Sequence, residues 1–176
     1  ERLYVTMNGY RQDHFAPYVF CSDDLGKTWR SVSGNLPMEC VNVIREDSKH
    51  EGLLYVGTDH GLYATTNGGA QWYLMSGILP AVSIHDLVIQ EREEDLVVGT
   101  HGRSIWIIDL EHIRESVSKA NQPMALLTPR PIKHRSDWGS NWSKWLEPTL
   151  PHADIVISAS GPQTCSALTL NFGDSL

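Results

Sequence analysis

Short apolar runs recur along the first two thirds of the chain, and Gly, Asn, Asp or Pro separates each run from the next. Four of them follow one another in the middle of the chain, at Val41–Glu46, Leu53–Thr58, Gly61–Thr66 and Gln71–Ser76. They are rich in β-branched and aromatic residues and are bounded by turn residues, which is typical of strands. The pattern predicts a four-stranded antiparallel meander.

The same pattern recurs on either side of this meander. Leu3-Tyr4-Val5-Thr6 matches Leu54-Tyr55-Val56-Gly57, and Trp29 lies 43 positions before Trp72. The flanking strands are expected near Leu3–Met7, Tyr18–Ser22, Thr28–Ser33, Ser83–Gln90, Asp95–Thr100 and Ser104–Ile108. A period of this length, with short strands in each repeat, predicts propeller blades.

We therefore expect an all-β fold, with a partial β-propeller of about two and a half four-stranded blades over residues 1–120. The first blade lacks its first strand, and the last lacks its fourth, because Asp109 is predicted to cap a short helix that runs to Asn121. Since propellers close with roughly four to eight blades, the sequence favours a piece of a larger propeller, whose remaining blades are its partner. The alternatives are a self-sufficient open sheet and an oligomer that closes by symmetry.

Residues 121–176 differ in composition and are expected to lie outside the propeller. Repeated prolines and the indoles of Trp138, Trp142 and Trp145 predict a Pro/Trp-rich connector. Two apolar runs, Ala153–Ser158 and Ala167–Phe172, predict a β-hairpin or a truncated β-sandwich. The indoles either seal the connector against the domain or stack on sugar rings.

The charge and composition of the chain exclude several classes of binding partner and site. The chain has 21 acidic and 14 basic residues, a formal net charge of −7, without a basic cluster, so nucleic acid and anionic lipid are poor candidates. No apolar run reaches the roughly 18 residues of a membrane span. Cys21, Cys40 and Cys165 form no CxxC pair, and their redox state is left open. The eight histidines follow no metal-ligand spacing, so neither a metal nor a cofactor is predicted.

One motif occurs twice in register, at the turn between the third and fourth strands of its repeat. The first copy consists of Ser22, Asp24, Gly26, Thr28 and Trp29, and the second of Thr65, Asn67, Gly69 and Trp72. In each copy the Asp or Asn side chain is expected to accept backbone hydrogen bonds, the glycine to supply a positive φ, and the hydroxyls to tie the turn together. The indole is expected to be buried between adjacent sheets.

The spacing S/T-x-D/N-x-G-x-x-W resembles the Asp-box, or bacterial neuraminidase (BNR) repeat, of sialidases, sortilin-type receptors, xyloglucan-cleaving propeller enzymes and photosystem II assembly propellers. The stretch from Val98 to Asp109 is similar to the final blade of large secreted bacterial proteins described as glycosyl-hydrolase-like or sortilin-like. This resemblance implies a secreted, periplasmic or cell-surface protein, with an immunoglobulin-type β-sandwich after the propeller. The third repeat departs from the pattern, because its box positions hold Ile108, Leu110, His112 and Glu115.

The resemblance also implies where a ligand binds. In this family the box turns lie opposite the ligand-binding face, so Asn8–Pro17, Thr58–Gly61 and Thr100–Ser104 are expected to line that face, together with Gly34–Cys40 and Gly77–Val82. The candidate binding residues in these loops are Arg11, Asp13, His14, Asp59, His60, His101 and Arg103. They are expected to contact a glycan or peptide. The alternative is that Asp59 and His101 cap tight turns while Arg103 pairs with a carboxylate of the neighbouring blade.

The sequence gives no positive sign of catalysis. A glycosidase needs two carboxyl groups at a fixed separation, and Asp13, Asp59 and Asp86 are available without any indication that two converge. No residues match the arginine triad, Tyr nucleophile and Glu partner of sialidases, so catalytic residues stay unknown. The sequence favours a non-catalytic fragment that binds a glycan or peptide. The alternatives are a sialidase- or xyloglucanase-like glycoside hydrolase with catalytic carboxylates partly in missing blades, and a structural assembly propeller.

Overall fold

A computed structural model describes residues 2–75, 79–119, 125–128 and 159–160. The chain divides into two compact units, Glu1–Glu111 and His112–Leu176. The first unit contains the expected strands and all of the candidate binding residues. The predicted strands Ala153–Ser158 and Ala167–Phe172, the indoles of Trp138, Trp142 and Trp145, and Cys165 lie outside the described residues.

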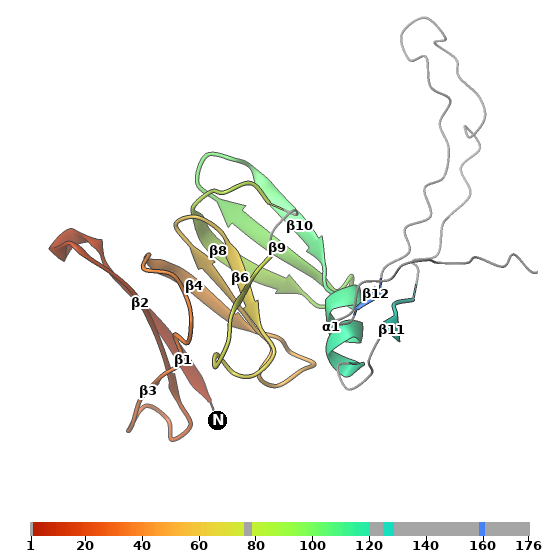
Figure 1. Cartoon of the computed structure of the whole chain (residues 1–176), viewed down its shortest axis with the longest axis horizontal. Coiled ribbons are helices and arrows are strands. Elements are labelled where there is room, and N and C mark those ends of the chain that lie inside the picture. The colour runs from red at the N-terminus through yellow and green to blue at the C-terminus, as the bar shows by residue number, and fades with distance from the viewer. Residues whose placement is uncertain (1, 76–78, 120–124, 129–158, 161–176) are drawn as a thin grey trace, which may run out of the picture. The chain divides into compact units, whose positions relative to one another are not determined.

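The first unit consists of three antiparallel sheets (Figure 1). The first sheet contains β1 (Leu3–Gly9), β2 (His14–Ser22) and β3 (Arg30–Ser31); the second contains β4 (Val41–Glu46), β5 (Leu54–Thr58), β6 (Leu62–Thr65) and β7 (Tyr73–Leu74); the third contains β8 (Ile84–Gln90), β9 (Asp95–Thr100) and β10 (Ile105–Asp109). Neighbours in the chain pair within each sheet, so each one is a meander, and the all-β expectation is confirmed.

The predicted loop Asn8–Pro17 is wrong for most of its length. β1 continues to Gly9 and β2 begins at His14, and these two residues pair across the hairpin. Only Tyr10–Asp13 lies outside the strands, as one turn of 3-10 helix that Asp13 closes at φ +57°. Asp is among the residues that tolerate this left-handed conformation, so two long strands meet at a short turn.

The second unit begins within helix α1 (Glu111–Ser118). The Asp109 carboxylate accepts a hydrogen bond from the Glu111 N–H at 2.8 Å, which confirms the predicted cap. Within the second unit, Glu115 accepts hydrogen bonds from Lys119 Nζ and from the Thr128 N–H and hydroxyl, and these contacts lower the pKa of Glu115 to about 2. The short strands β11 (Ala125–Leu126) and β12 (Ala159–Ser160) pair, a contact that the sequence did not predict.

Two close approaches hold the three sheets together. Between the first and second sheets, Val19 and Cys21 form a buried cluster with Leu54, Val56 and Trp72. Between the second and third sheets, Gly57 of β5 makes room for Ile84 of β8, since a Cβ at Gly57 would lie 2.5 Å from Ile84 Cγ2. Cys21 and Cys40 are free and buried.

The two motif turns form the same hydrogen bonds. In the first, Asp24 accepts from the Ser22 hydroxyl at 2.8 Å and from the Thr28 N–H and hydroxyl at 2.8 and 2.7 Å, which lowers the pKa of Asp24 to about 2. In the second, Asn67 accepts from the Thr65 hydroxyl and from the Gln71 N–H. The local prediction is therefore confirmed, except that Gln71 supplies no equivalent of the Thr28 hydroxyl bond.

The two indoles differ in burial, which corrects the prediction for one of them. Trp72 is 2% exposed and donates its indole N–H to the Val32 carbonyl of the first sheet at 2.9 Å. Trp29 is 44% exposed and donates to Gly26 of its own turn. The reason is positional, because Trp72 packs on the first sheet whereas no described sheet covers Trp29.

Candidate functional site

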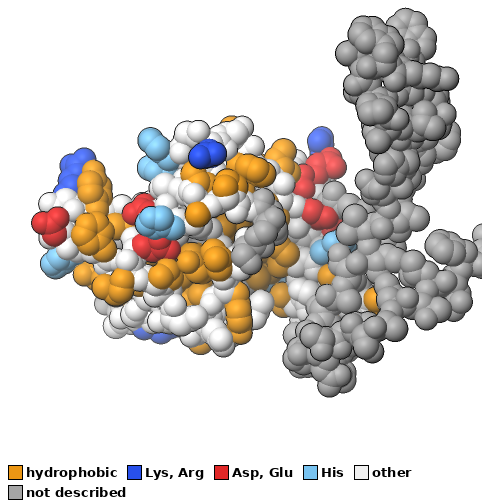
Figure 2. Space-filling view, turned by 45° about the horizontal axis from the view of Figure 1, so that its top comes forward, with side chains coloured by type: hydrophobic (Ala, Val, Ile, Leu, Met, Phe, Trp, Pro, Cys, Tyr) orange, Lys and Arg blue, Asp and Glu red, His pale blue; other side chains and the backbone are white. Residues whose placement is uncertain are grey.

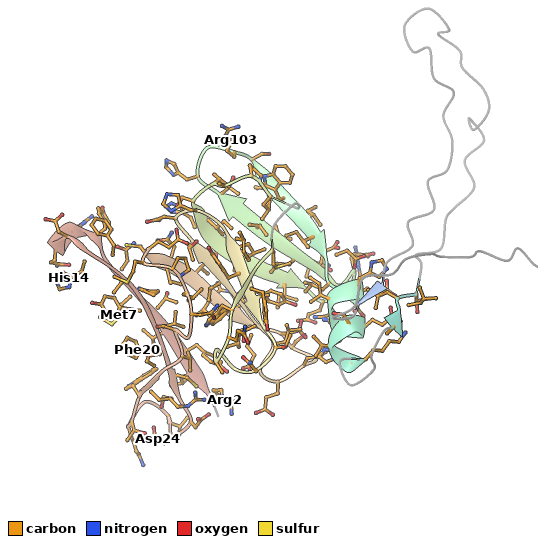
Figure 3. All side chains as sticks on the ribbon, viewed as in Figure 1. Arg2, Met7, His14, Phe20, Asp24 and Arg103 are labelled. Carbon is orange, nitrogen blue, oxygen red and sulfur yellow. The ribbon has the colours of Figure 1, made fainter. Side chains whose placement is uncertain are left out.

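The turns β1–β2, β5–β6 and β9–β10 lie at the end of the sheets away from the two motif turns, and we call this end the loop rim. It comprises Tyr10–Asp13, Asp59–Gly61 and His101–Ser104. Figure 3 shows His14 and Asp24 at opposite ends of the first sheet, and Arg103 at the tip of its own turn. The candidate binding residues therefore all lie on or beside the loop rim.

A chain of side-chain hydrogen bonds crosses the rim from the first sheet to the third. Asn8 donates to Asn42 at 3.0 Å, and Asn42 donates to Asp59 at 3.0 Å and to the Ile84 carbonyl at 3.2 Å. Ser83 donates its hydroxyl to the same Asp59 oxygen at 3.3 Å. Asp59 is thus a cross-link between sheets rather than a turn cap, and the neighbouring Thr58 hydroxyl bonds its own turn instead.

His60 is the best-positioned side chain on the rim. Its Nδ1 lies 2.5 Å from Oε2 of Glu39, while its side chain remains 76% exposed and that of Glu39 only 9%. A buried carboxylate that binds one ring nitrogen fixes the ring and leaves the other nitrogen toward a ligand. Glu39 also acts on Tyr63 of β6: burial raises the pKa of this phenol, the negative charge of Glu39 adds to the effect, and the phenol stays protonated.

A hollow of about 110 Å³ opens beside His60. His60, Gly61, Leu62, Leu74, Met75, Leu79, Pro80 and Ala81 line it. One imidazole over an otherwise apolar lining suits a ligand that carries a polar group next to a small apolar one.

His101 and Arg103 occupy the equivalent turn of the third sheet. The centroid of the His101 ring lies 5.1 Å from that of the His85 ring, and the backbone N–H of His101 donates to the Ser83 carbonyl. Arg103 is exposed, and its pairing with a carboxylate of the neighbouring blade stays a prediction. Figure 2 shows histidine side chains spread over this face among acidic and apolar ones.

The third turn, in the first sheet, is less organised. Arg11 folds back over the ring of Tyr10, 5.9 Å from its centroid, and Asp13 closes the turn through its N–H. The His14 carbonyl accepts the Cys40 thiol at 4.0 Å. Burial raises the pKa of Cys40 and the charge of Asp59 adds to this, so the thiol is protonated and able to donate.

The structure brings Asp59, His60 and His101 into one connected region and leaves Arg11 and Asp13 within their own turn. Sequence reasoning missed Glu39 and Asn42. Asn42 did carry a signal, since it is a polar residue inside the apolar run of a strand. Glu39 carried none, because a carboxylate in a loop is usually exposed.

Two of the carboxylates considered for catalysis are engaged by other side chains. Asp59 is engaged by Asn42 and Ser83, and Asp86 pairs with Arg45 at 3.2 Å. Within the described residues no group of three or more His, Cys, Asp or Glu side chains is placed to hold a metal ion. No described helix is long and apolar enough to cross a membrane.

Comparisons with known proteins identify no family. No protein-family model matches the chain, and no curated protein matches it either.

Proposed function

We propose that the chain is a ligand-binding part of an Asp-box β-propeller, similar to sortilin-like and glycosyl-hydrolase-like secreted proteins, and that its loop rim binds a glycan or peptide without cleaving it. The observation that carries the binding role is the exposed His60 ring, held by buried Glu39 beside an apolar hollow. Glycans and peptides both place hydrogen-bonding groups next to small apolar ones.

Two features support the propeller. Successive meanders pack on each other in chain order, and two box-type turns repeat the same pattern of hydrogen bonds. A closed ring needs more than three sheets, so further blades, of a parent propeller or of an assembled one, complete it. The proposal places the protein outside the cytoplasm, as in the proteins it resembles.

Binding to a glycan array and to a peptide library, with parallel assays on chromogenic glycosides, tests this function. We expect binding without hydrolysis, and we expect His60→Ala to weaken it about tenfold, the cost of one hydrogen bond to a charged or polarised group. Thr66→Ala is the matched control, because Thr66 is exposed at the other end of the same hairpin. Hydrolysis by the wild type would instead favour a glycoside hydrolase, and binding that survives in His60→Ala would remove this site.

A structural assembly role is the second candidate. The outer faces of the first and third sheets are apolar and exposed, with Val5 at 39% and Ile107 at 67%. Exposed apolar patches of this kind mark association surfaces. Absence of binding to all glycans and peptides tested would favour this role.

A further inference from the structure

The first sheet turns an apolar face to solvent. Leu3, Val5 and Met7 are 37%, 39% and 57% exposed, and Trp29 is 44% exposed. Val5, Met7, Phe20 and Trp29 line a hollow of about 270 Å³ on this face. In Figure 3, Met7 and Phe20 point away from the second sheet. Aromatic and aliphatic side chains gathered round one hollow are typical of a surface that another element covers.

Strand register shows which positions these are. Cross-strand pairs Leu3–Ser22 and Val5–Phe20 in the first sheet correspond to Leu54–Thr65 and Val56–Tyr63 in the second. Leu54 and Val56 are fully buried, and they pack on Val19 and Cys21 of the first sheet. We call the contact between two successive sheets a joint; the joint between the first and second sheets is formed by Leu54, Val56 and Trp72 on one side and Val19 and Cys21 on the other. The exposed Leu3 and Val5 of the first sheet are therefore equivalent to Leu54 and Val56, which are buried in that joint.

The other half of that joint is exposed on the third sheet. At the joint between the first and second sheets it is made by Val19 and Cys21, both 0% exposed. By register, the corresponding residues of the third sheet are Ile105 and Ile107, which are 69% and 67% exposed. The chain thus carries both halves of a joint that it already makes internally, one on each outer sheet.

We propose that a second copy of the chain docks on the first sheet through its third sheet, head to tail. The joint inserts the Trp29 ring against the Ile105–Ile107 face, as Trp72 inserts against Val19 and Cys21. Joints of this kind use two different faces, so they either close into a ring or continue as a filament. Two copies supply six meanders, within the four to eight of closed propellers, so the expected assembly is a closed dimer.

The proposed dimer interface lies on the exposed faces of the first and third sheets and not on the loop rim. It does not depend on the proposed ligand, and the two proposals fail separately. A dimer that binds no glycan or peptide would support the proposed interface and refute the ligand-binding role. A monomer that binds such a ligand would support the ligand-binding role and refute the proposed interface.

Sedimentation and light scattering of the full chain, over a wide range of concentration, test the proposal. We expect a species of twice the chain mass of 19.7 kDa. Met7→Asp and Ile107→Lys, both at exposed positions, should each weaken association at least tenfold, since each buries a charge in an apolar joint. Thr66→Asp, at an exposed position directly after β6 of the second sheet, should change nothing.

Mixing the two variants distinguishes a head-to-tail interface from a symmetric one. A copy with Met7→Asp keeps its third sheet and a copy with Ile107→Lys keeps its first, so the mixture should regain a dimer with one unaltered joint. A symmetric interface between like faces predicts no such recovery. A chain that stays monomeric at high concentration, a dimer unaffected by both substitutions, or a mixture without recovery would each overturn the proposal, and a sheet from another polypeptide segment would then be the occupant.

Discussion

The indole N–H of Trp72 donates to the backbone carbonyl of Val32 at 2.9 Å, and this bond links the second sheet to the first. Trp72 is 2% exposed and belongs to the cluster that fills the joint. Trp29 occupies the same position of the first motif but faces solvent. The same motif position therefore holds a buried indole in the second sheet and an exposed one in the first, and the two indoles should contribute differently to the free energy of unfolding.

Replacing Trp72 by Ala should lower the free energy of unfolding by about 3–5 kcal/mol, because it removes a buried ring and leaves the Val32 carbonyl without its donor. Trp29→Ala is the matched control and should cost about 1 kcal/mol or less at protein concentrations at which the chain is monomeric, as its ring is then half in water. Urea unfolding followed by circular dichroism measures both. Equal losses in the two variants would contradict the account of the joint.

The fold followed closely from the sequence where local chemistry decides it. Strand periodicity predicted β4 and β9 with their exact residues, and the two motif turns formed the expected bonds. The exposure of Trp29 was not predictable, since it depends on what lies on the other side of the sheet. Likewise, the Glu39–His60 contact joins residues from two loops, and only the packing of those loops brings them together.

Asp24 makes the stability depend on pH. Its pKa falls from the ordinary 3.8 to about 2 in the folded chain, because it accepts hydrogen bonds from Thr28 and Ser22. A carboxyl group with a lower pKa in the folded state stabilises above the unfolded value and loses this contribution as the pH falls through the folded value. Stability should therefore decline between about pH 4 and pH 2.

Urea midpoints of the wild type and of Asp24→Asn over this pH range measure the contribution. The amide cannot titrate, so the variant should be less stable at neutral pH and should show a weaker decline with acid. Asp13→Asn, in a turn at the other end of the sheet, is the control. Parallel curves for wild type and Asp24→Asn would exclude this carboxylate as the source.

Two adjacent glycines give a test of the second motif turn. Gly69 has φ +91° and a Cβ there would lie 2.5 Å from the Val32 carbonyl oxygen, whereas Gly68 has φ +67° and open space around it. Gly68→Ala should cost about 1 kcal/mol of backbone strain alone, and Gly69→Ala about 2–4 kcal/mol, since backbone must also move. Thermal unfolding ranks the two variants, and the reverse order would show that Gly69 does not lie against the first sheet.

The loop rim depends on Asn42, whose amide bonds both Asp59 and the Ile84 carbonyl. Asn42→Ala should lower the free energy of unfolding by about 1–2 kcal/mol, because two acceptors lose their donor. It should also speed amide hydrogen exchange at Asp59–Gly61, where the turn is tied to the third sheet through that carboxylate.

Asn35→Ala is a matched control, since this amide bonds the backbone of Trp72 at the joint and not the rim. The control should destabilise the chain to a similar degree and leave exchange at the rim unchanged, because Asn42 ties the second sheet to the third whereas Asn35 holds Trp72 at the contact between the first and second sheets. If ligand binding weakens in Asn42→Ala and persists in Asn35→Ala, the position of His60, and not stability in general, sets the affinity of the rim.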